Sequence, residues 1–515
     1  MEKEFKFEIG PDKAAVLPDM SRLRALQTQA PREVALASEY FDTPDLLLRR
    51  AGASLRVRRE GKHCVQTLKG AAKARAGFFE REEYETGLAG TQPELAALRQ
   101  AIAPDSSLAD VLQSPSLPSQ LKPVFSVRTT RLVWPLRLST GDEIELALDR
   151  GEIKAGKHAQ SFCELELELK QGQQQHLHQL ALQLVDELGL SLGLRSKSDR
   201  GYALLGAESL SSASAIPIVL KRRDTLEQAF DKIAANCLAH IHANAPGVAA
   251  ASVPEAVHQM RVGIRRLRSA LQNFAPMLSL PAPLQDDLKW LVDALGQSRD
   301  LEVLAFSTFP RLQVPASKRQ EIARAESIAA MQALASREQA AQALRSPRGA
   351  RLLLGLDLWL TQAPWREDAD PARRKLLQTP ARAFAAKLLK KRRRQLLARG
   401  RGLQRLEGAA LHRARIAVKK MRYSLEFFCS LFEPRIWNKT LRALNRLQDD
   451  LGSRNDLQVA DRLLAQMHGK NHAALCFARG VLAAHMARAG QPDKRRWRRF
   501  KRAAGGLQRG LKAAL

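Results

Sequence analysis

Residues 162–170 read Phe-Cys-Glu-Leu-Glu-Leu-Glu-Leu-Lys, in which acidic and apolar side chains alternate. Residues two apart in a β-strand share one face, so Glu164, Glu166 and Glu168 lie together on one side and the leucines on the other. A charged face in water is the plainer interpretation, but three carboxylates on one face repel each other unless a cation binds them. The stretch therefore predicts a strand whose charged face encloses a ligand.

The same alternation recurs through the first 205 residues. It begins at the N-terminus with Glu2, Glu4 and Lys6, which alone is a weak signal because edge strands facing water also carry alternating charges. In most of these segments the apolar residues occupy one face and the charged residues the other. Further alternating segments cover 54–59, 64–69, 79–85, 125–134 and 143–149.

Turn and helix signals separate these strands. Gly61-Lys62 and Ala155-Gly156-Lys157 predict hairpin turns, and helical patterns lie at about 93–103 and 173–188. We expect an α+β domain with six to eight antiparallel strands, closed into a barrel or strongly curved. If the charges lie inside, arginines and lysines can bind phosphates while carboxylates hold a divalent metal, and hard oxygen ligands select Mg²⁺ or Mn²⁺.

Net charge divides the chain into two parts. Residues 1–210 hold 28 Lys and Arg against 29 Asp and Glu, whereas residues 211–515 hold 55 against 24, a net charge of +31. A near-neutral part joined to a strongly basic part predicts two domains with different functions. The basic part is expected to attract a polyanion. The candidates are nucleic acid, an anionic membrane and a chain of phosphates.

Other features of the composition narrow the class of protein. The 515 residues are enough for two or three domains, each with its own core. The five cysteines are scattered without a Cys-x-x-Cys pair, which fits reduced thiols. The N-terminus carries no apolar signal region, and no apolar run approaches the length of a membrane span. We expect a cytoplasmic protein without a membrane partner.

From about residue 219 the sequence is helical throughout and rich in Ala, Leu, Arg and Gln. The stretch 209–217, rich in Ser and Ala, predicts a linker before it. Asp224-Thr225-Leu226-Glu227 predicts a capping box that opens the first helix.

A repeat organises this helical part. Residues 257–268 align with 411–422 without a gap, and each is followed by a Leu-Gly-x-x-x-Asp-Leu-x-Val segment, at 295–303 and at 451–459. The two offsets are 154 and 156 residues, so we interpret the helical part as one duplicated unit.

Each aligned helix carries two adjacent stripes. One stripe is apolar and predicts the side facing the core; it comprises Met260, Ile264, Leu267 and Leu271 in the first copy and Ala414, Val418, Met421 and Leu425 in the second. The other stripe places one histidine and three cations together, namely His258, Arg261, Arg265 and Arg268, and His412, Arg415, Lys419 and Arg422. Basic stripes are usually solvated and lone histidines usually structural, but two matching copies favour a polyanion-binding surface.

The motifs of the first 205 residues resemble those of the CYTH family of triphosphate tunnel metalloenzymes. This family's fold is an eight-stranded antiparallel tunnel whose charged lumen holds a triphosphate and a divalent metal, and the resemblance implies both here. The matching pieces are Glu2-x-Glu4-x-Lys6, Tyr40-Phe41-Asp42-Thr43, Leu55-Arg56-Val57-Arg58, Thr67-Leu68-Lys69-Gly70, Arg81-x-Glu83-x-Glu85, Glu143-Ile144-Glu145, Asp149-Arg150-Gly151, Glu164-Leu165-Glu166-Leu167-Glu168 and Lys197-Ser198-x-Arg200-Gly201-Tyr202.

The resemblance also implies roles for these residues. Catalysis is expected of Glu4, Lys6, Arg56 and Arg58. Substrate phosphates are expected to bind Lys6, Arg56, Arg58, Lys69, Arg81, Arg128, Arg131, Lys197 and Arg200. Mg²⁺ or Mn²⁺ is expected to bind Glu2, Glu4, Glu145, Asp149, Glu164 and Glu166.

Two of these assignments stay open. Lys6 can be a phosphate ligand or, if neighbouring arginines lower its pKa, a general base. Arg128 and Arg131 are three residues apart, which in a regular strand places them on opposite faces, so a β-bulge is needed to bring both into the tunnel.

The helical part resembles the CHAD family, through both His-x-x-Arg helices and both Leu-Gly-x-x-x-Asp-Leu segments, over about 219–500. The resemblance implies a duplicated pair of four-helix units around a basic cavity that binds inorganic polyphosphate. The residues expected to bind it are His258, Arg261, Arg265, Arg268, His412, Arg415, Lys419 and Arg422, with Lys390 and Arg394 on another helix. The basic run 494–502 is interpreted as an accessory electrostatic patch rather than a defined site.

Together these features predict a CYTH tunnel at 1–205, a linker at 206–218, and a CHAD domain at 219–505 with repeats at about 219–370 and 371–505. We expect a metal-dependent enzyme that hydrolyses inorganic tripolyphosphate to diphosphate and phosphate. We expect its helical domain to bind inorganic polyphosphate, which would allow association with polyphosphate granules.

Alternative functions remain open. The tunnel can act on an organic triphosphate, such as thiamine triphosphate, a nucleotide (as a cyclase) or an RNA 5′ end; these rings need stacking or apolar walls, and only 5% of the residues are aromatic. A tunnel that binds polyphosphate without cutting it is the second alternative, against which the intact set of acids argues. Nucleic acid is not expected on the helical part, because few aromatic residues are present to stack bases.

Overall fold

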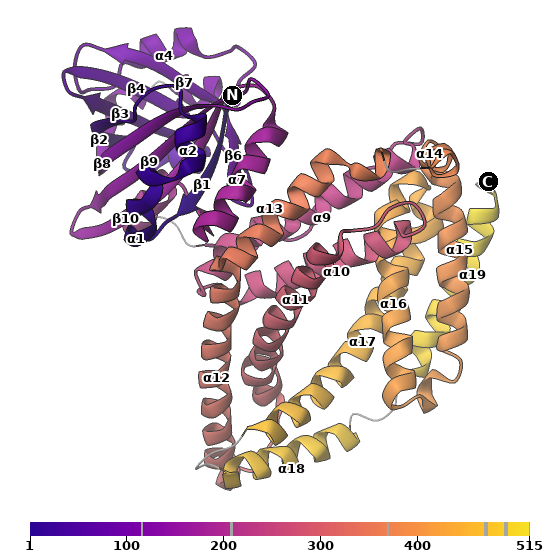
Figure 1. Cartoon of the computed structure of the whole chain (residues 1–515). Coiled ribbons are helices and arrows are strands. Elements are labelled where there is room, and N and C mark those ends of the chain that lie inside the picture. The colour runs from indigo at the N-terminus through magenta and orange to yellow at the C-terminus, as the bar shows by residue number, and fades with distance from the viewer. Residues whose placement is uncertain (115–116, 207–209, 368–369, 468–471, 489–492, 514–515) are drawn as a thin grey trace. The chain divides into compact units, whose positions relative to one another are not determined.

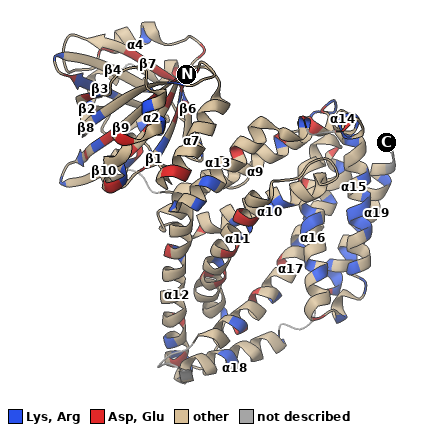
Figure 2. Cartoon of the chain, viewed as in Figure 1, with Lys and Arg blue, Asp and Glu red and all other residues tan. Residues whose placement is uncertain are grey.

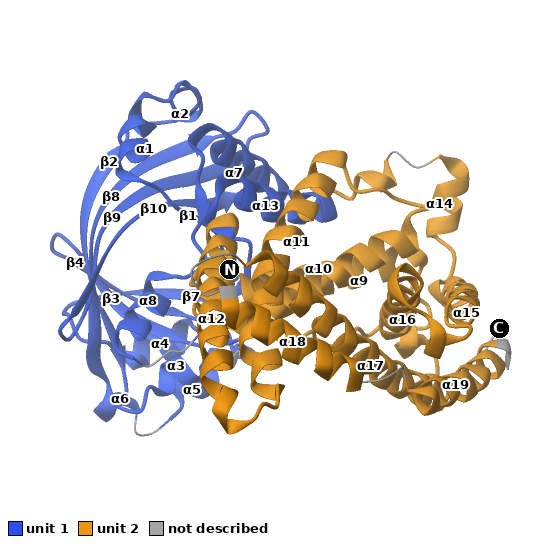
Figure 3. Cartoon of the chain, turned by 90° about the horizontal axis from the view of Figure 1, so that it is seen from below, with its two compact units in different colours: residues 1–211, 344–361 blue, residues 212–343, 362–515 orange. Residues whose placement is uncertain are grey.

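The computed structural model describes the chain except residues 115–116, 207–209, 368–369, 468–471, 489–492 and 514–515 (Figure 1). The described residues form two compact units, the first of Met1–Ser211 with Leu344–Thr361 and the second of Ser212–Ala343 with Gln362–Leu515 (Figure 3). The first unit ends within the predicted linker 206–218, but it also includes Leu344–Thr361, which the sequence analysis places in the helical domain. Helical periodicity alone does not tell which unit a helix packs against.

One antiparallel sheet makes up most of the first unit. Its main path runs in the order β5-β6-β1-β10-β9-β8-β2-β3-β4-β7, and β11 pairs with β1 beside this path. The strands are β1 (Glu2–Glu8), β2 (Arg32–Asp42), β3 (Ser54–Glu60), β4 (His63–Lys69), β5 (Lys73–Arg75), β6 (Phe78–Arg81), β7 (Glu83–Leu88), β8 (Lys122–Arg137), β9 (Glu143–Ala155), β10 (His158–Gln171) and β11 (Ser191–Leu192).

A single stretch of chain joins the two ends of this sheet. β6 pairs with β1, with Arg81 opposite Glu2, while β7 pairs with β4, with Glu83 opposite Lys69. Only Glu82 separates β6 from β7, so the strand predicted at 79–85 is one extended segment that pairs on both sides. Counting this segment once and leaving aside the short β5 and β11 gives the predicted eight strands, of which β2 carried no alternation signal in the sequence.

The apolar face of the sheet points outward and is covered by helices. Phe5 and Phe7 of β1 are fully buried, and the Phe5 ring lies 4.6 Å from the His178 ring of α7 (Gln174–Leu188). Leu55 and Leu68, on β3 and β4, pack in one cluster with residues of α4 (Leu95–Ala101) and α5 (Ser107–Leu112). Burial of the apolar side chains under these helices leaves the charged side chains to face the interior of the curled sheet.

The predicted hairpins are present. β3 and β4 are joined at Gly61, and β9 and β10 at Gly156; both glycines have positive φ, +57° and +56°. The remaining helices of this unit are α1 (Pro11–Val16), α2 (Ser21–Leu26), α3 (Leu47–Arg50), α6 (Leu117–Gln120), α8 (Lys197–Leu204) and α13 (Pro347–Gln362).

The second unit is helical and shows the duplication. In the first copy α9 packs on α10 and α10 on α11, and in the second α15 packs on α16 and α16 on α17; across the copies α10 contacts α16 and α11 contacts α17. Its helices are α9 (Leu226–Ala249), α10 (Pro254–Phe274), α11 (Ala282–Val303), α12 (Arg319–Arg345), α14 (Pro371–Leu377), α15 (Ala381–Arg399), α16 (Gly408–Phe428), α17 (Pro434–Gln466), α18 (His472–Arg488) and α19 (Lys494–Ala513).

The capping box of α9 lies one residue beyond the predicted position. Thr225, not Asp224, is the N-cap, and it forms the box with Gln228. Asp224 instead accepts a hydrogen bond from the backbone N–H of Lys221 and pairs with Lys232 at 2.6 Å. In the described part of the chain, no helix combines the length and the apolar character that crossing a bilayer requires.

Candidate functional site

The interior of the curled sheet is a cavity of about 300 Å³, and nine acidic and nine basic residues line it. Most of the residues predicted for the tunnel meet there, although they come from strands far apart in sequence. The predicted residues that line the cavity are Glu2, Glu4, Lys6, Arg56, Arg58, Lys69, Arg81, Arg131, Glu145, Asp149, Glu166 and Lys197.

Arg128 is a predicted phosphate ligand that lies on the opposite face of the sheet from the cavity. The pairing of β8 with β9 runs without a shift from Arg128, opposite Glu152, to Arg131, opposite Asp149. Without the bulge that the sequence analysis required, Arg128 is exposed on the face opposite to Arg131. Its predicted contact with substrate in the tunnel is therefore incorrect for this structure.

Glu164 and Arg200 lie next to the cavity rather than in its lining. Glu164 is opposite Asp149 in the β9–β10 register, and it pairs with Arg200 of α8. The guanidinium of Arg200 lies 5.4 Å from the Phe162 ring, which holds it against the sheet.

Several lining residues were not among the predicted site residues. Some lay on strand faces already identified from the sequence, so the alternation of Arg81, Glu83 and Glu85 could have identified two of them. Arg32 belongs to β2, where no charge alternation pointed to a strand. The charged residues of the lining that were missed are Arg32, Glu60, Glu83, Glu85, Glu168 and Lys170.

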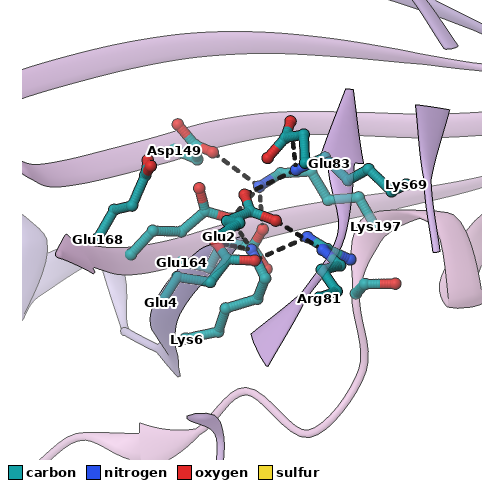
Figure 4. Close-up of polar contacts among 12 residues, drawn as sticks. Glu2, Glu4, Lys6, Lys69, Arg81, Glu83, Asp149, Glu164, Glu168 and Lys197 are labelled. Atoms are coloured by element: carbon teal, nitrogen blue, oxygen red, sulfur yellow. Dashed lines mark hydrogen bonds and ion pairs between the residues drawn. The ribbon is translucent and has the colours of Figure 1, made fainter. Parts of the chain in front are cut away.

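One end of the charged network is built around Glu2 (Figure 4). Its two carboxylate oxygens accept from Lys69 Nζ at 2.7 Å and from Arg81 Nε at 2.6 Å. Arg81 also donates to Glu4 at 2.7 Å, and Lys69 lies 3.0 Å from Glu83. This end therefore joins β1, β4, β6 and β7 across the point where the sheet curls onto itself.

The other end is built around Glu166, which three cations contact. Arg131 donates to Glu166 Oε2 at 2.6 Å, Lys197 donates to Oε1 at 2.9 Å, and Lys6 pairs with the same carboxylate. Arg131 also binds both oxygens of Asp149, at 2.7 and 2.6 Å, in the bidentate geometry favoured by guanidinium and carboxylate. Glu166 is thus the shared partner of three elements, β1, β8 and α8.

Asp149, Glu164 and Glu166 form a buried acidic group whose ligand oxygens all lie within 4.8 Å of one another. Three carboxylates at this spacing are hard oxygen donors of the kind that Mg²⁺ and Mn²⁺ prefer, so the donor set fits a divalent cation. Lys197 pairs with all three carboxylates, at 2.7 Å from Asp149 and 2.9 Å from Glu166, and its ammonium supplies positive charge where such an ion would supply it.

Lys6 does not have the lowered pKa that a general base needs. Burial alone would lower its pKa, but the carboxylates of Glu166 and Glu4 outweigh burial and raise it. Burial likewise opposes the charged form of Glu166, yet Lys197, Lys6 and Arg131 hold its pKa well below the usual range. These groups therefore stay charged, which favours Lys6 as a phosphate ligand over Lys6 as a base.

Asp42 explains part of the Tyr40-Phe41-Asp42-Thr43 motif. It is fully buried outside the cavity lining, accepting from the backbone N–H groups of Leu48 at 2.9 Å and Arg49 at 3.0 Å and from Tyr202 O–H at 2.8 Å. Asp42 thereby fixes α3 and α8, and α8 presents Lys197 to the acidic group. A Cβ on Gly201 of α8 would lie 2.3 Å from the Phe125 ring, so this contact needs glycine.

A second cluster of charged groups lies where the two helical copies meet. Arg261 of α10 donates to the Gly296 carbonyl oxygen of α11 at 2.8 Å and lies 3.5 Å from Asp300, which explains why the His-x-x-Arg and Leu-Gly-x-x-x-Asp motifs occur together. Arg265 of the first copy lies close enough to Arg415 and Lys419 of the second to lower the pKa of both. We call Arg261, Arg265, Arg415 and Lys419 the central cluster.

The four side chains of the central cluster are partly buried, and two of them have buried nitrogens without a partner in the described part of the chain. Arg265 Nε and Arg415 Nη1 are buried atoms without a hydrogen-bond partner among the described residues. Burial, followed by the neighbouring Arg415, Arg265 and Arg261, lowers the pKa of Lys419 to about 7. Burial and Arg299 lower the pKa of the nearby His258 to about 4, so this imidazole is neutral at neutral pH. Buried nitrogens of charged groups that lack a hydrogen-bond partner are costly unless an anion binds them.

Five other residues predicted to bind polyphosphate are not part of the central cluster. Arg268, His412 and Arg394 are exposed, Lys390 is half-buried, and Arg422 pairs with Glu426 at 2.8 Å. Within the described part of the chain, none of these five residues forms an ion pair or hydrogen bond with the central cluster. Helical periodicity placed Arg268 and Arg422 in the same stripe as the cluster residues, but it did not show where along each helix the two copies meet.

Comparisons with known proteins match two families, one to each part of the chain. The CYTH domain model matches residues 1–202, and the CHAD domain model matches residues 232–465. The chain is 32% identical, over 208 residues or 40% of its length, to an inorganic triphosphatase of Haemophilus influenzae, and the match spans 55% of that relative. The crystal structure of the CHAD domain from the plant Ricinus communis matches with 36% identity and a TM-score of 0.50, covering 59% of this chain and 98% of that chain. The chain therefore belongs to the CYTH family in its N-terminal part and to the CHAD family in its helical part.

Proposed function

We propose that the CYTH domain hydrolyses inorganic tripolyphosphate to diphosphate and phosphate with Mg²⁺ or Mn²⁺, and that the CHAD domain binds inorganic polyphosphate. The observation that carries the first part is a single cavity lined by nine basic residues, with Asp149 and Glu166 of the buried acidic group in its lining and Glu164 next to it. The relative from Haemophilus influenzae, described as an inorganic triphosphatase, supports this choice. Binding of polyphosphate would hold the protein at polyphosphate granules in the cytoplasm.

Arg56 and Arg58 are the cavity cations most available to an incoming phosphate. Arg56 lies 3.9 Å from both Glu83 and Glu85, and Arg58 lies 3.4 Å from Glu85, whereas Arg81 and Arg131 form pairs of 2.6 to 2.7 Å. Arg56 Nε is buried without a hydrogen-bond partner among the described residues. In this proposal Arg56 and Arg58 bind and orient the phosphate chain, which keeps their guanidinium charges satisfied.

The tightly paired cations have a different role in the proposal. Lys6, Arg131 and Lys197 hold the carboxylates of Glu166 and Asp149 ionised and in place. A divalent ion held by Asp149, Glu164 and Glu166, with Glu2, Glu4 and Glu145 lining the same cavity, would polarise phosphoryl oxygens and offset developing negative charge. Lys69 and Arg81 would then neutralise phosphate oxygens at the end of the cavity built around Glu2.

The walls of the cavity favour an inorganic substrate. Tyr40 is the only aromatic residue among those that line the described cavity, and its ring is already stacked on Phe125 at 4.4 Å. A nucleobase or thiamine ring needs aromatic or apolar surface to replace its contacts with water. Organic triphosphates, as substrates of a hydrolase or a cyclase, remain the alternative that the experiment below separates.

The test is phosphate release by the purified full-length protein with Mg²⁺ or Mn²⁺. We expect fast release from tripolyphosphate and much slower release from ATP, thiamine triphosphate and long-chain polyphosphate, with loss of activity on chelation of the metal. Glu4→Ala, which removes a partner of Lys6 and Arg81, is expected to be inactive. Faster release from an organic triphosphate would show that this compound, and not tripolyphosphate, is the substrate. Absence of phosphate release from every compound would contradict the proposal that the protein is an enzyme.

The central cluster carries the proposal for the CHAD domain. It brings three arginines and a lysine from both copies into one place, with two buried guanidinium nitrogens that lack partners among the described residues. A linear chain of phosphates offers oxygen acceptors at short intervals and needs no aromatic platform, so its chemistry matches this cluster.

Binding of polyphosphate to the central cluster is expected to weaken as pH rises above about 7. Lys419 has a pKa of about 7 in the free protein, so its amine is mostly neutral above that pH, and a bound phosphate chain would have to restore the proton. Below about pH 7 the amine is already charged, so the affinity is expected to level off there. Uptake of one proton corresponds to at most about tenfold in affinity per pH unit.

The measurement is the dissociation constant for long-chain polyphosphate at constant ionic strength, from about pH 6 to about pH 9. Lys419→Gln is expected to remove the pH dependence, and Lys419→Arg to keep high affinity throughout, because a guanidinium stays protonated. An unchanged pH profile in Lys419→Gln would show that another group titrates. His258, with its pKa of about 4, stays neutral over this range.

A further inference from the structure

A second basic groove lies on the helical unit between α17 and α19, and its lining contains no acidic residue among the described ones. It has a volume of about 580 Å³. Helix α19 lies beyond residues 232–465, which the CHAD model matches. The lining cations, which define the α17–α19 groove, are Arg435, Lys439, Arg442 and Arg446 of α17 and Arg496, Arg499, Arg502 and Arg509 of α19.

These cations form two opposed rows. On each helix they recur mostly three or four residues apart, which places them on one face. The helices run antiparallel, since Thr440 Oγ1 donates to the Ala503 carbonyl oxygen at 3.1 Å, and Arg496 donates to the Arg446 carbonyl oxygen at 3.2 Å. From Arg435 to Arg446 the row on α17 is about 16 Å long, at about 1.5 Å per residue.

Most of this charge is uncompensated. Arg496 lies 3.4 Å from Asp493 and 3.8 Å from Asp450, and Arg435 lies 2.5 Å from Glu433. The other six cations form no ion pair among the described residues; they are Lys439, Arg442, Arg446, Arg499, Arg502 and Arg509. Six like charges facing one groove repel each other, and an extended anion lying between the rows relieves this repulsion.

The rest of α19 shows which anion fits. Its apolar face is packed inside the protein, with Phe500 and Leu511 fully buried, so α19 is not a helix that lays an apolar face into a membrane. Trp497 is also buried, and no aromatic residue lines the groove, so bases would find no surface on which to stack. Small residues line part of the groove, and a Cβ on Gly506 would meet no atom within 4 Å. The groove therefore has room for an extended chain of phosphates.

We propose that the α17–α19 groove is a second binding site for inorganic polyphosphate, separate from the central cluster and built from cations of α17 and α19. The basic colouring of α19 is visible in Figure 2. This inference rests on the proposed affinity of the CHAD domain for polyphosphate. It replaces the interpretation of residues 494–502 as a diffuse patch by a groove with two defined rows.

The experiment compares two triple variants of the full-length protein with equal loss of charge. Arg442→Gln/Arg499→Gln/Arg502→Gln removes three exposed, unpaired cations of the groove, and Arg319→Gln/Arg324→Gln/Arg462→Gln removes three exposed cations elsewhere on α12 and α17. The dissociation constant for long-chain polyphosphate is measured at several salt concentrations with a metal chelator present. Single-stranded RNA of similar total charge is measured in parallel.

The groove variant is expected to bind polyphosphate at least about tenfold more weakly than the control variant, with a salt slope lower by about 2 because three counterion-releasing contacts are lost. Equal affinities of the two variants would overturn the inference. Loss of RNA binding with unchanged polyphosphate binding would also overturn it and assign the groove to nucleic acid. A wild-type protein that binds no polyphosphate would instead refute the proposed function of the domain.

Discussion

Glu166→Gln is expected to lower kcat for tripolyphosphate by about 10²- to 10³-fold, the cost typical of removing one well-placed electrostatic group. The change keeps the shape of the side chain but removes the charge that Lys6, Arg131 and Lys197 share. It also removes one carboxylate from the acidic group with Asp149 and Glu164. Both the proposed binding of a divalent metal and the orientation of the cations that would bind phosphate are therefore expected to change.

Two measurements separate these effects from misfolding. The concentration of Mg²⁺ or Mn²⁺ that gives half-maximal activity is expected to rise in Glu166→Gln, because a ligand is weakened. Glu168→Gln is the matched control, since Glu168 lies on the same face of β10 and pairs at 2.8 Å with Lys170, outside the acidic group. Full activity of a folded Glu166→Gln protein would contradict the proposed site. If that variant fails to fold, Asp149→Asn tests the same acidic group.

Arg265→Gln/Arg415→Gln is expected to weaken polyphosphate binding by at least about 100-fold. Each guanidinium would form charge-assisted hydrogen bonds of about 1.5–3 kcal/mol with phosphate, and about 1.4 kcal/mol corresponds to a factor of ten. Both residues have buried nitrogens without a partner among the described residues, and they lie close enough together for Arg265 to lower the pKa of Arg415. The residual affinity would come from the α17–α19 groove.

The same double variant is expected to be more stable than the wild type without ligand. Removing two partly buried cations that repel each other eliminates an unfavourable interaction in the folded state, so the thermal unfolding temperature should rise in the absence of polyphosphate. Arg319→Gln/Arg324→Gln, two exposed positions on α12, is the control and should change neither quantity. A variant that binds polyphosphate as well as the wild type would remove the central cluster as a binding site, while unchanged hydrolysis of tripolyphosphate is expected in every case.

The charged lining of the tunnel could be predicted from the sequence because the side chains of a strand alternate between its two faces. Once Glu164, Glu166 and Glu168 are assigned to one face, the leucines between them must occupy the other, whatever the rest of the fold. The same rule identified Glu2, Glu4 and Lys6. The prediction of both Arg128 and Arg131 required a bulge; in the regular strand that the structure shows, only Arg131 faces the cavity. Alternation along a strand determines the face on which each side chain lies, and it depends only on residues of that strand.

The duplicated motifs could also be predicted from the sequence, because they depend on the spacing of residues within one helix. Gapless alignment of 257–268 with 411–422 shows that two helices present similar side chains, and the hydrogen bond from Arg261 to Gly296 explains why a second motif accompanies the helix of the first copy. The alignment did not show that Arg265 and Arg415 approach each other while Arg268 and His412 face water. That outcome depends on where α10 and α16 meet, which is set by the packing of their apolar stripes.

By itself, then, the sequence determined two families, the charged face of each strand and the cationic face of each repeat, because these depend on spacing along one element. Tertiary structure alone decided that β6 and β7 pair with strands at both ends of the sheet, that Leu344–Thr361 belongs with the first unit, and that α19 lies antiparallel to α17. These features join residues distant in sequence, and they follow from which buried surfaces fit together, a property that no local period encodes.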